Sequence, residues 1–206
     1  MPTAQEALLH PVTIADLRPT QITVGMREVE LKRQDWRNRD LDSGDKFLSK
    51  HMIPVIVGPD KLRYITDHHH LALALHKEGV PGAFVTIVAN LSTLDDDAFW
   101  VVLDNRAWMH PFDASGKRRP YSDIPKSITD LIDDPFRSLA GALRRKGGYA
   151  KDTTPFSEFL WADFLRRKLP HADMNKGFDA ALDEALQLAK SKDAGYLPGW
   201  CGPSDE

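Results

Sequence analysis

The first half of the chain carries short apolar runs separated by turn-forming residues. Residues 52–57 are apolar and β-branched, which predicts a strand, and the Gly-Pro-Asp sequence at 58–60 predicts a turn after it. Residues 62–66 then read as the return strand of a hairpin. A helical pattern follows over residues 71–78, and residues 84–89 are apolar enough to predict another buried strand. The order strand, turn, strand, helix, strand indicates a mixed sheet.

The segment before this hairpin is less regular. Residues 20–24 are rich in β-branched side chains and predict a strand. Residues 26–33 alternate apolar and charged positions, which fits either a second strand or the opening of a helix. Residues 34–45 are polar, so we expect a surface loop there, followed by a short helix over residues 46–51.

The second half of the chain is helical in pattern. Ser92 is a candidate N-cap for a helix whose first turn holds three aspartates and whose apolar positions continue to residue 109. A turn-rich connector leads to a short helix over residues 125–131. Three longer helices are predicted after it, namely one that starts at Asp134-Pro135 and ends at Gly147-Gly148, one over residues 156–169 and one over residues 178–190.

These patterns predict an α+β fold for the 206-residue chain. Residues 12–91 would form a small mixed sheet with helices. Residues 92–190 would form a helical extension packed on that sheet, as part of the same globular unit, and residues 191–206 an irregular tail.

Composition narrows the possible functions. The formal charge of −3 offers no global basic field for nucleic-acid binding, and the basic cluster at residues 117–119 fits a solvated loop better than a nucleic-acid contact. The single cysteine, Cys201, excludes a disulfide framework and a multi-cysteine zinc site. We expect neither a signal peptide nor a membrane span, and we expect a cytoplasmic location.

The richest chemistry lies at the junction between the return strand and the helix after it. Asp67, His68, His69 and His70 stand there in a row. The first N–H groups of a helix lack intrahelical partners and carry the positive end of its dipole, so this place suits phosphate or another anion. Histidines there can donate hydrogen bonds to phosphate or act as acid or base. Asp67 would orient a histidine or bind a metal ion.

The same residues also have plainer interpretations. Asp67 is a common type of N-cap, and the histidines could simply be partly exposed. Zinc is disfavoured, because consecutive histidines point in different directions and no His-Glu-x-x-His pattern is present. In a second segment, residues 133–141, Arg137 and Ser138 would lie in the first turns of a helix, where they could face a ligand. The neighbouring Phe136 and Leu139 fit packing against the sheet.

The order of elements and several motifs resemble the ParB/sulfiredoxin superfamily. The resemblance rests on Ile53-Pro54-Val55-Ile56-Val57, the turn at residues 58–60, and the strand–turn–helix sequence from Tyr64 to His70. Thr20-Gln21 with Val24-Gly25, and residues 134–141, resemble more narrowly the branch of ParB-like nucleases. The resemblance spans about residues 12–170.

The resemblance implies a turn that binds nucleotide phosphates. Superfamily members bind and hydrolyse CTP and clamp DNA, reduce a sulfinic acid, or phosphorylate free serine with a nucleotide. This chain has His68 where the wider family often has glycine and Leu71 where it often has arginine. Another cation would replace the missing bidentate phosphate ligand, with Lys32, Arg33, Arg137 and the basic run 144–146 as candidates.

The resemblance also implies roles for individual residues. Sulfinic-acid reduction needs a cysteine at the turn, which is absent. Kinase-like members use an acid from the N-terminal elements to activate an acceptor hydroxyl, and Glu28 and Glu30 are the local candidates. Asp67 and His69 would be catalytic, with His68 and His70 in support. Lys32, Arg137 and Ser138 would contact the phosphate, and Glu158 is a speculative pocket residue.

We therefore expect a site for a nucleotide (ATP, ADP or CTP) or a small phosphate ester at residues 67–70, with phosphoryl transfer or phosphate-ester hydrolysis. Mg²⁺ would accompany the nucleotide, with Asp67 as its ligand. A non-catalytic nucleotide- or DNA-binding regulatory module is the first alternative. A metal-dependent nuclease, which the family resemblance implies, is the second, although no acidic cluster surrounds Asp67 in the sequence.

Overall fold

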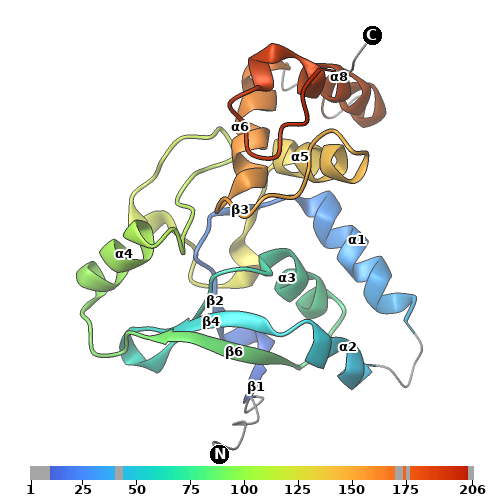
Figure 1. The fold of residues 1–206 in the computed structure, drawn as a ribbon. Helices are drawn as coiled ribbons and strands as arrows, with labels where there is room; N and C mark the ends of the chain where they lie inside the picture. The colour runs from blue at the N-terminus through green and yellow to red at the C-terminus, as the bar shows by residue number, and fades with distance from the viewer. Residues whose placement is uncertain (1–9, 40–43, 170–173, 175–176, 204–206) are drawn as a thin grey trace, which may run out of the picture.

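The computed structural model describes residues 10–39, 44–169, 174 and 177–203. Its elements form a mixed α/β arrangement, which confirms the predicted fold class in its broad form. Figure 1 shows the sheet at the end near the N-terminus and the last helices stacked at the opposite end. Between the two ends, α1 (Met26–Arg37) lies beside α3 (His69–Lys77) and also contacts α5 (Pro135–Arg145).

One five-stranded sheet carries the first half of the chain. In spatial order the strands are β1 (His10–Thr13), β6 (Gly82–Asn90), β4 (Ile53–Val57), β5 (Arg63–Ile65) and β2 (Leu17–Arg18). The central strand β4 runs parallel to β6 and antiparallel to β5, with an irregularity of register between Val55 and Ile56. The outer strands are β1, which pairs with β6, and β2, which pairs with β5.

The predicted hairpin is present. A 3-10 turn at Pro59–Lys61 joins β4 to β5, and Asp60 and Lys61 both adopt left-handed backbone conformations there. The next strand, β6, was predicted to be buried throughout, and this was wrong for its second half. Thr86, Ile87 and Val88 are exposed, whereas Ala89 packs against the cluster around Phe99.

The segment over residues 26–33 is a helix, not a strand. Val29 and Trp36 of α1 are seven residues apart and face the core, whereas Leu31, which produced the apparent alternation, is exposed. The loop predicted over residues 34–45 was also wrong in part. Helix α1 continues to Arg37, and α2 (Gly44–Lys50) begins before that range ends; residues 40–43 lie outside the described part.

A small parallel pair links the two halves of the chain. Of the strand predicted over residues 20–24, only β3 (Thr23–Val24) joins a ladder, and its partner is β7 (Ile132–Asp133). This pairing places the turn before α1 directly beside the start of α5. The short helix predicted over residues 125–131 is a single 3-10 turn at Ile128–Asp130.

The helical half follows the predicted order. Helix α4 (Asp96–Asn105) is capped by Asp95, whose carboxylate accepts from Ala98 N at 2.8 Å, so the predicted cap Ser92 was wrong. The predicted extension of this helix to residue 109 also fails, because Ala107 has a φ of 52°. Helices α5, α6 (Ser157–Lys168) and α8 (Phe178–Lys190) surround a second core that contains Phe136, Trp161 and Phe164.

The described part of the tail, predicted to be irregular, begins with a 3-10 turn at Lys192–Ala194 and then packs on the helices. Pro198 O accepts a hydrogen bond from Trp161 Nε1 at 2.8 Å, and Ala150 N donates to Gly199 O at the same distance. Within the described residues, no helix combines the length and apolarity needed to cross a bilayer.

Candidate functional site

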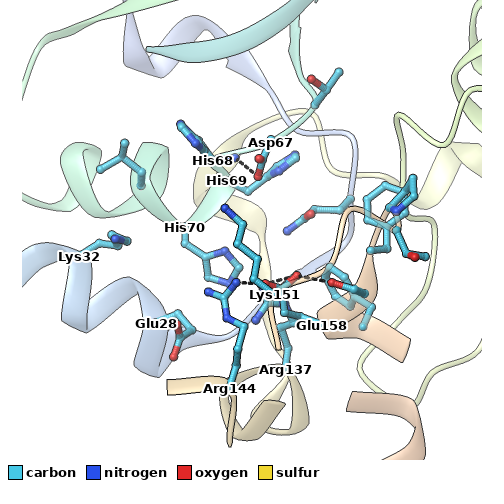
Figure 2. A pocket seen from close by; sticks show the side chains of 18 of the residues that line it. Glu28, Lys32, Asp67, His68, His69, His70, Arg137, Arg144, Lys151 and Glu158 are labelled. Carbon is cyan, nitrogen blue, oxygen red and sulfur yellow. Dashed lines mark hydrogen bonds and ion pairs between the residues drawn. The ribbon is translucent and has the colours of Figure 1, made fainter. Parts of the chain in front are cut away.

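A cavity of about 490 Å³ lies where the two halves of the molecule meet. Figure 2 shows His68, His69 and His70 on one side of it, with Arg137, Arg144, Lys151 and Glu158 reaching in from another. The walls come from the β5–α3 junction, α1, α2, α5, the loop over residues 151–156 and the start of α6. The predicted histidine turn is therefore part of a concave site.

The start of α3 is not capped by a side chain. Its N-cap position is His68, in a left-handed conformation with φ 66°, and the His68 side chain makes no capping hydrogen bond. Asp67 does not cap the helix either, because its carboxylate accepts from the adjacent His68 N at 2.6 Å. His69, His70 and Leu71 form the first turn and line the cavity. The positive end of the α3 dipole is therefore available to an anion there.

One buried and one partly buried hydrogen bond from the backbone determine the tautomers of His69 and His70. Thr20 N donates to His69 Nε2 at 3.1 Å, and Gly25 N donates to His70 Nε2 at 3.0 Å. A backbone N–H can only donate, so both Nε2 atoms are unprotonated and each neutral ring carries its proton on Nδ1. Sequence alone gave no indication that the segment before α1 would hold both rings.

Burial keeps both imidazoles neutral. Desolvation lowers the pKa of His69 to about 3, with smaller contributions from His68 and His110. Desolvation also lowers the pKa of His70 well below its usual value, and the positive charge of Arg137 acts in the same direction. The two rings are therefore uncharged hydrogen-bond donors at neutral pH, and their basic nitrogens are already used.

Four cations border the cavity. Arg137 and Arg144 come from α5, Lys151 from the loop after it, and Lys32 from α1. The Arg137 side chain is only 12% exposed, and its guanidinium lies 5.2 Å from the centre of the Phe159 ring. Its Nε atom is enclosed and has no hydrogen-bond partner among the described residues. Figure 2 shows the side chains of Arg144 and Lys151 beside His70.

The two glutamates that line the cavity, Glu28 and Glu158, are engaged in ion pairs. Arg145 donates two hydrogen bonds to Glu28, one of them 2.6 Å long. Glu158 lies 2.9 Å from Arg144 Nη1 and 4.0 Å from Arg137 Nη2. Glu30, the other predicted acid, does not line the cavity. It pairs with Arg33 at 2.7 Å and Arg37 at 3.6 Å on another face of α1.

Ser138 has a structural position outside the cavity lining. It is 1% exposed, and its Oγ accepts a hydrogen bond from Arg27 N at 3.2 Å, near the start of α1. A Cβ on Gly25 would come within 2.7 Å of that Oγ and 2.8 Å of Ser138 N. Glycine at position 25 thus permits the close approach of the two helix starts, which in turn places Gly25 N against His70.

Backbone strain gathers around the cavity. His68, Ala107 and Phe156 all have positive φ, at 66°, 52° and 58°, and all three line the cavity. The left-handed region is costly for residues other than glycine, asparagine and aspartate, and such strain is concentrated at functional sites. The backbone geometry therefore supports the assignment of this cavity as the site.

Several lining residues were not predicted from the sequence. Lys151, Asp152 and Thr154 lie in a polar loop without periodic pattern, and Gln21 and Phe156 were not singled out as ligands. Only the tertiary arrangement brings them to the histidine turn. Glu158 and Arg144, named as candidates from the sequence, do border the cavity.

The described residues do not form a preassembled metal site. No group of three histidine, cysteine, aspartate or glutamate side chains among them is placed to hold a metal ion.

The basic cluster over residues 117–119 is partly paired within its own half of the chain. Arg118 contacts Asp104, and Arg119 lies 2.9 Å from Asp123.

Comparison with known families assigns the chain to one of them. Residues 10–167 match the family described as "Putative ParB-like nuclease", and because that match covers most of the chain, the protein belongs to this family. The crystal structure of protein Atu1540 from Agrobacterium tumefaciens is similar to it, with a TM-score of 0.87 and 55% sequence identity. That similarity covers 94% of this chain and 98% of the other. No curated protein matches the chain significantly.

Proposed function

We propose that the cavity binds a nucleotide or another phosphate ester, with its phosphates at the start of α3. The observation that carries this proposal is the uncapped first turn of α3, which faces one cavity together with Arg137, Arg144 and Lys151. The site offers a phosphate backbone N–H groups, two imidazole N–H donors and three cations. The two imidazoles are neutral and act as hydrogen-bond donors. Lys32 adds a fourth cation at the rim.

The reaction that fits this donor set best is phosphoryl transfer or phosphate-ester hydrolysis. In such reactions the protein mainly positions groups and neutralises charge. Glu28 is the proposed activating carboxylate, because it lines the cavity and Arg145 holds its orientation. His69 and His70 serve as donors to phosphate oxygens, and general-base action by their Nε2 atoms would require the contacts with Thr20 and Gly25 to break.

Mg²⁺ would have to arrive with the nucleotide. Magnesium in phosphate sites takes one or two carboxylates, with water and substrate phosphates as its other ligands. Asp67 is the proposed protein ligand, and one of its oxygens already accepts from His68 N. No step of the proposed reaction depends on that ion.

A non-catalytic binding module remains the second candidate for a specific reason. Glu28 and Glu158 are both held in ion pairs, and both buried imidazoles use their basic nitrogens in hydrogen bonds. A protein of this kind would bind the same phosphate ester without turnover. A metal-dependent nuclease is suggested by the family description. The described residues contain no group of acidic, histidine or cysteine side chains that is placed to hold a catalytic metal ion, so the structure does not add support for it.

Calorimetry with ATP, ADP, CTP and pyrophosphate, with and without Mg²⁺, tests the binding proposal. Arg144→Ala should weaken binding about tenfold or more, because it removes a cation and leaves the Glu158 carboxylate with only the more distant Arg137. Lys146→Ala is the matched control, since Lys146 caps the same helix, is exposed and does not line the cavity. No binding by any of these ligands, or equal effects of the two variants, would refute the phosphate site.

Product analysis then separates the candidate activities. Labelled nucleotide with candidate hydroxyl acceptors should yield transferred phosphate for a phosphotransferase and free phosphate for a hydrolase. Binding without either product would establish the non-catalytic module. Lack of DNA binding at low salt would remove the DNA-dependent readings, because electrostatic binding to DNA is strongest there.

A further inference from the structure

One wall of the cavity is aromatic. Phe156 and Phe159 both line it, and the His110 ring stacks on Phe159 with 3.9 Å between ring centres. The centres of the His110 and Phe156 rings lie 5.0 Å apart. Burial lowers the pKa of His110 to about 3, so this ring is neutral as well. The wall therefore consists of two phenylalanine rings, backed by the neutral ring of His110, beside a strongly charged site.

Phe156 occupies a position that its side chain does not favour. It is the N-cap residue of α6, its φ is 58°, and its side chain makes no capping hydrogen bond. Glycine or asparagine holds this conformation at lower cost than a bulky aromatic residue. The half-buried ring nevertheless lines the cavity. Contact between the ring and a ligand would explain why an aromatic residue is kept in this unfavourable conformation.

Gln21 supplies a polar group next to the aromatic wall. An isolated parallel bridge pairs Gln21 with His110, which brings its backbone beside that of the central ring. Gln21 is 4% exposed and lines the cavity, and its Nε2 donates to Thr23 O at 2.7 Å. That hydrogen bond fixes the orientation of the carboxamide. Its oxygen accepts no hydrogen bond from a described residue, which leaves it as an acceptor for a ligand in the cavity that Gln21 lines.

From these contacts we infer that the cavity has a second subsite, for a flat heteroaromatic group that carries an N–H donor. The group stacks on Phe156 and donates to the oxygen of Gln21. Together with the phosphate site at α3, on whose existence this inference rests, it selects nucleotides that bear an amino-substituted base over phosphate esters without one. Base-on-aromatic stacking is sequence-tolerant, whereas the carboxamide oxygen favours bases with an amino group.

Calorimetric titration of ADP and of inorganic pyrophosphate into the same variants tests the subsite. Phe156→Leu keeps an apolar side chain but removes the ring, and it should weaken ADP binding about tenfold with pyrophosphate binding unchanged. Gln21→Met should act in the same direction with a smaller effect. Phe112→Leu is the matched control, because Phe112 stacks on His110 at 4.7 Å but does not line the cavity. Urea unfolding of each variant verifies that it is folded.

The outcomes separate this inference from the proposed function. If pyrophosphate binds but ADP binds no more tightly, or if Phe156→Leu affects both ligands equally, the base subsite is wrong and the phosphate site stands. An equal loss of ADP affinity in Phe112→Leu would also overturn the subsite, since it would indicate a general effect on the aromatic cluster. If neither ligand binds the wild-type chain, both proposals fail.

Discussion

An aspartate lies near the start of both α3 and α5, and the two helix starts have opposite designs. At the start of α5, the Asp134 carboxylate accepts from Phe136 N and Arg137 N and also pairs with Arg166 at 2.6 Å. At the start of α3, Asp67 accepts a hydrogen bond from the adjacent His68 N and does not cap the helix, whose first turn lines a cavity. The first aspartate completes its helix, whereas the second leaves the helix start available to a ligand. The same residue type thus serves stability in one place and leaves binding capacity in the other.

Removal of the two carboxylates should show this difference most strongly. Asp134→Ala removes a cap and half of a buried ion pair, since Asp134 is 1% exposed, and should lower the free energy of unfolding by about 3–5 kcal/mol. Asp67→Ala, at an exposed carboxylate, should cost less than about 1 kcal/mol. Urea unfolding of the two variants measures both values. Equal losses would mean that Asp67 supports its helix as Asp134 does.

Acid should destabilise the α3 start through its buried histidines. The pKa of folded His69, about 3, lies below its unfolded value, so the unfolded chain binds more protons between about pH 3 and 6.5. Its contribution to stability is therefore complete above that window and is lost as the pH falls through it. Between pH 6.5 and 5 the loss is about 2 kcal/mol for this histidine.

Unfolding experiments at pH 7 and pH 5 check the size of that term. His69→Gln removes the titrating group and should reduce the difference in stability between the two pH values by about 2 kcal/mol. His76→Gln is the control, because His76 lies in the last turn of the same helix, outside the cavity. An unchanged pH dependence in His69→Gln would show that the ring is not held neutral.

The close approach of the two helix starts can be tested at Gly25. A Cβ there would meet Ser138 backbone atoms at 2.8 and 3.0 Å, so Gly25→Ala should lower the free energy of unfolding by about 1–3 kcal/mol. It should also weaken pyrophosphate binding, because Gly25 N holds the His70 ring. Gly177→Ala, whose Cβ would lie 3.6 Å from its nearest neighbour, is the control for both measurements. A neutral Gly25→Ala would contradict the tight packing.

The smallest expected effect concerns the charge balance of the cavity. Glu158 forms an ion pair with Arg144 and lies near Arg137, so its carboxylate competes with a ligand anion for the same cations. Glu158→Gln should therefore strengthen pyrophosphate binding about tenfold in calorimetry. Asp163→Asn, on the same helix but paired with Arg166 and Arg167 outside the cavity, should leave the affinity unchanged. Weaker binding by Glu158→Gln would assign Glu158 a supporting role instead.

The sequence by itself determined the local elements whose signals lie within a few residues. The hairpin around Pro59, the helix start at Asp134-Pro135 and the end of that helix before Gly147 followed from turn and cap chemistry. It also located the histidine turn, because a strand end, an acid and a helix start are adjacent there. The alternation over residues 26–33 left a strand and a helix as alternatives, because Leu31 is apolar yet exposed on α1.

Only the tertiary structure decided what the histidine turn can do. The N–H groups of Thr20 and Gly25, almost fifty residues away from the rings they contact, determine which nitrogens of His69 and His70 carry protons. Arg137, Arg144 and Lys151 come from α5 and the loop that follows it. The β3–β7 pairing and the contact between α1 and α5 place these three cations beside the histidine turn. A residue pattern records which neighbours a side chain has along the chain. Protonation, desolvation and charge balance depend on neighbours in space, and here they come from both halves of the molecule, with the backbone donors before α1 and three of the cations in the helical half.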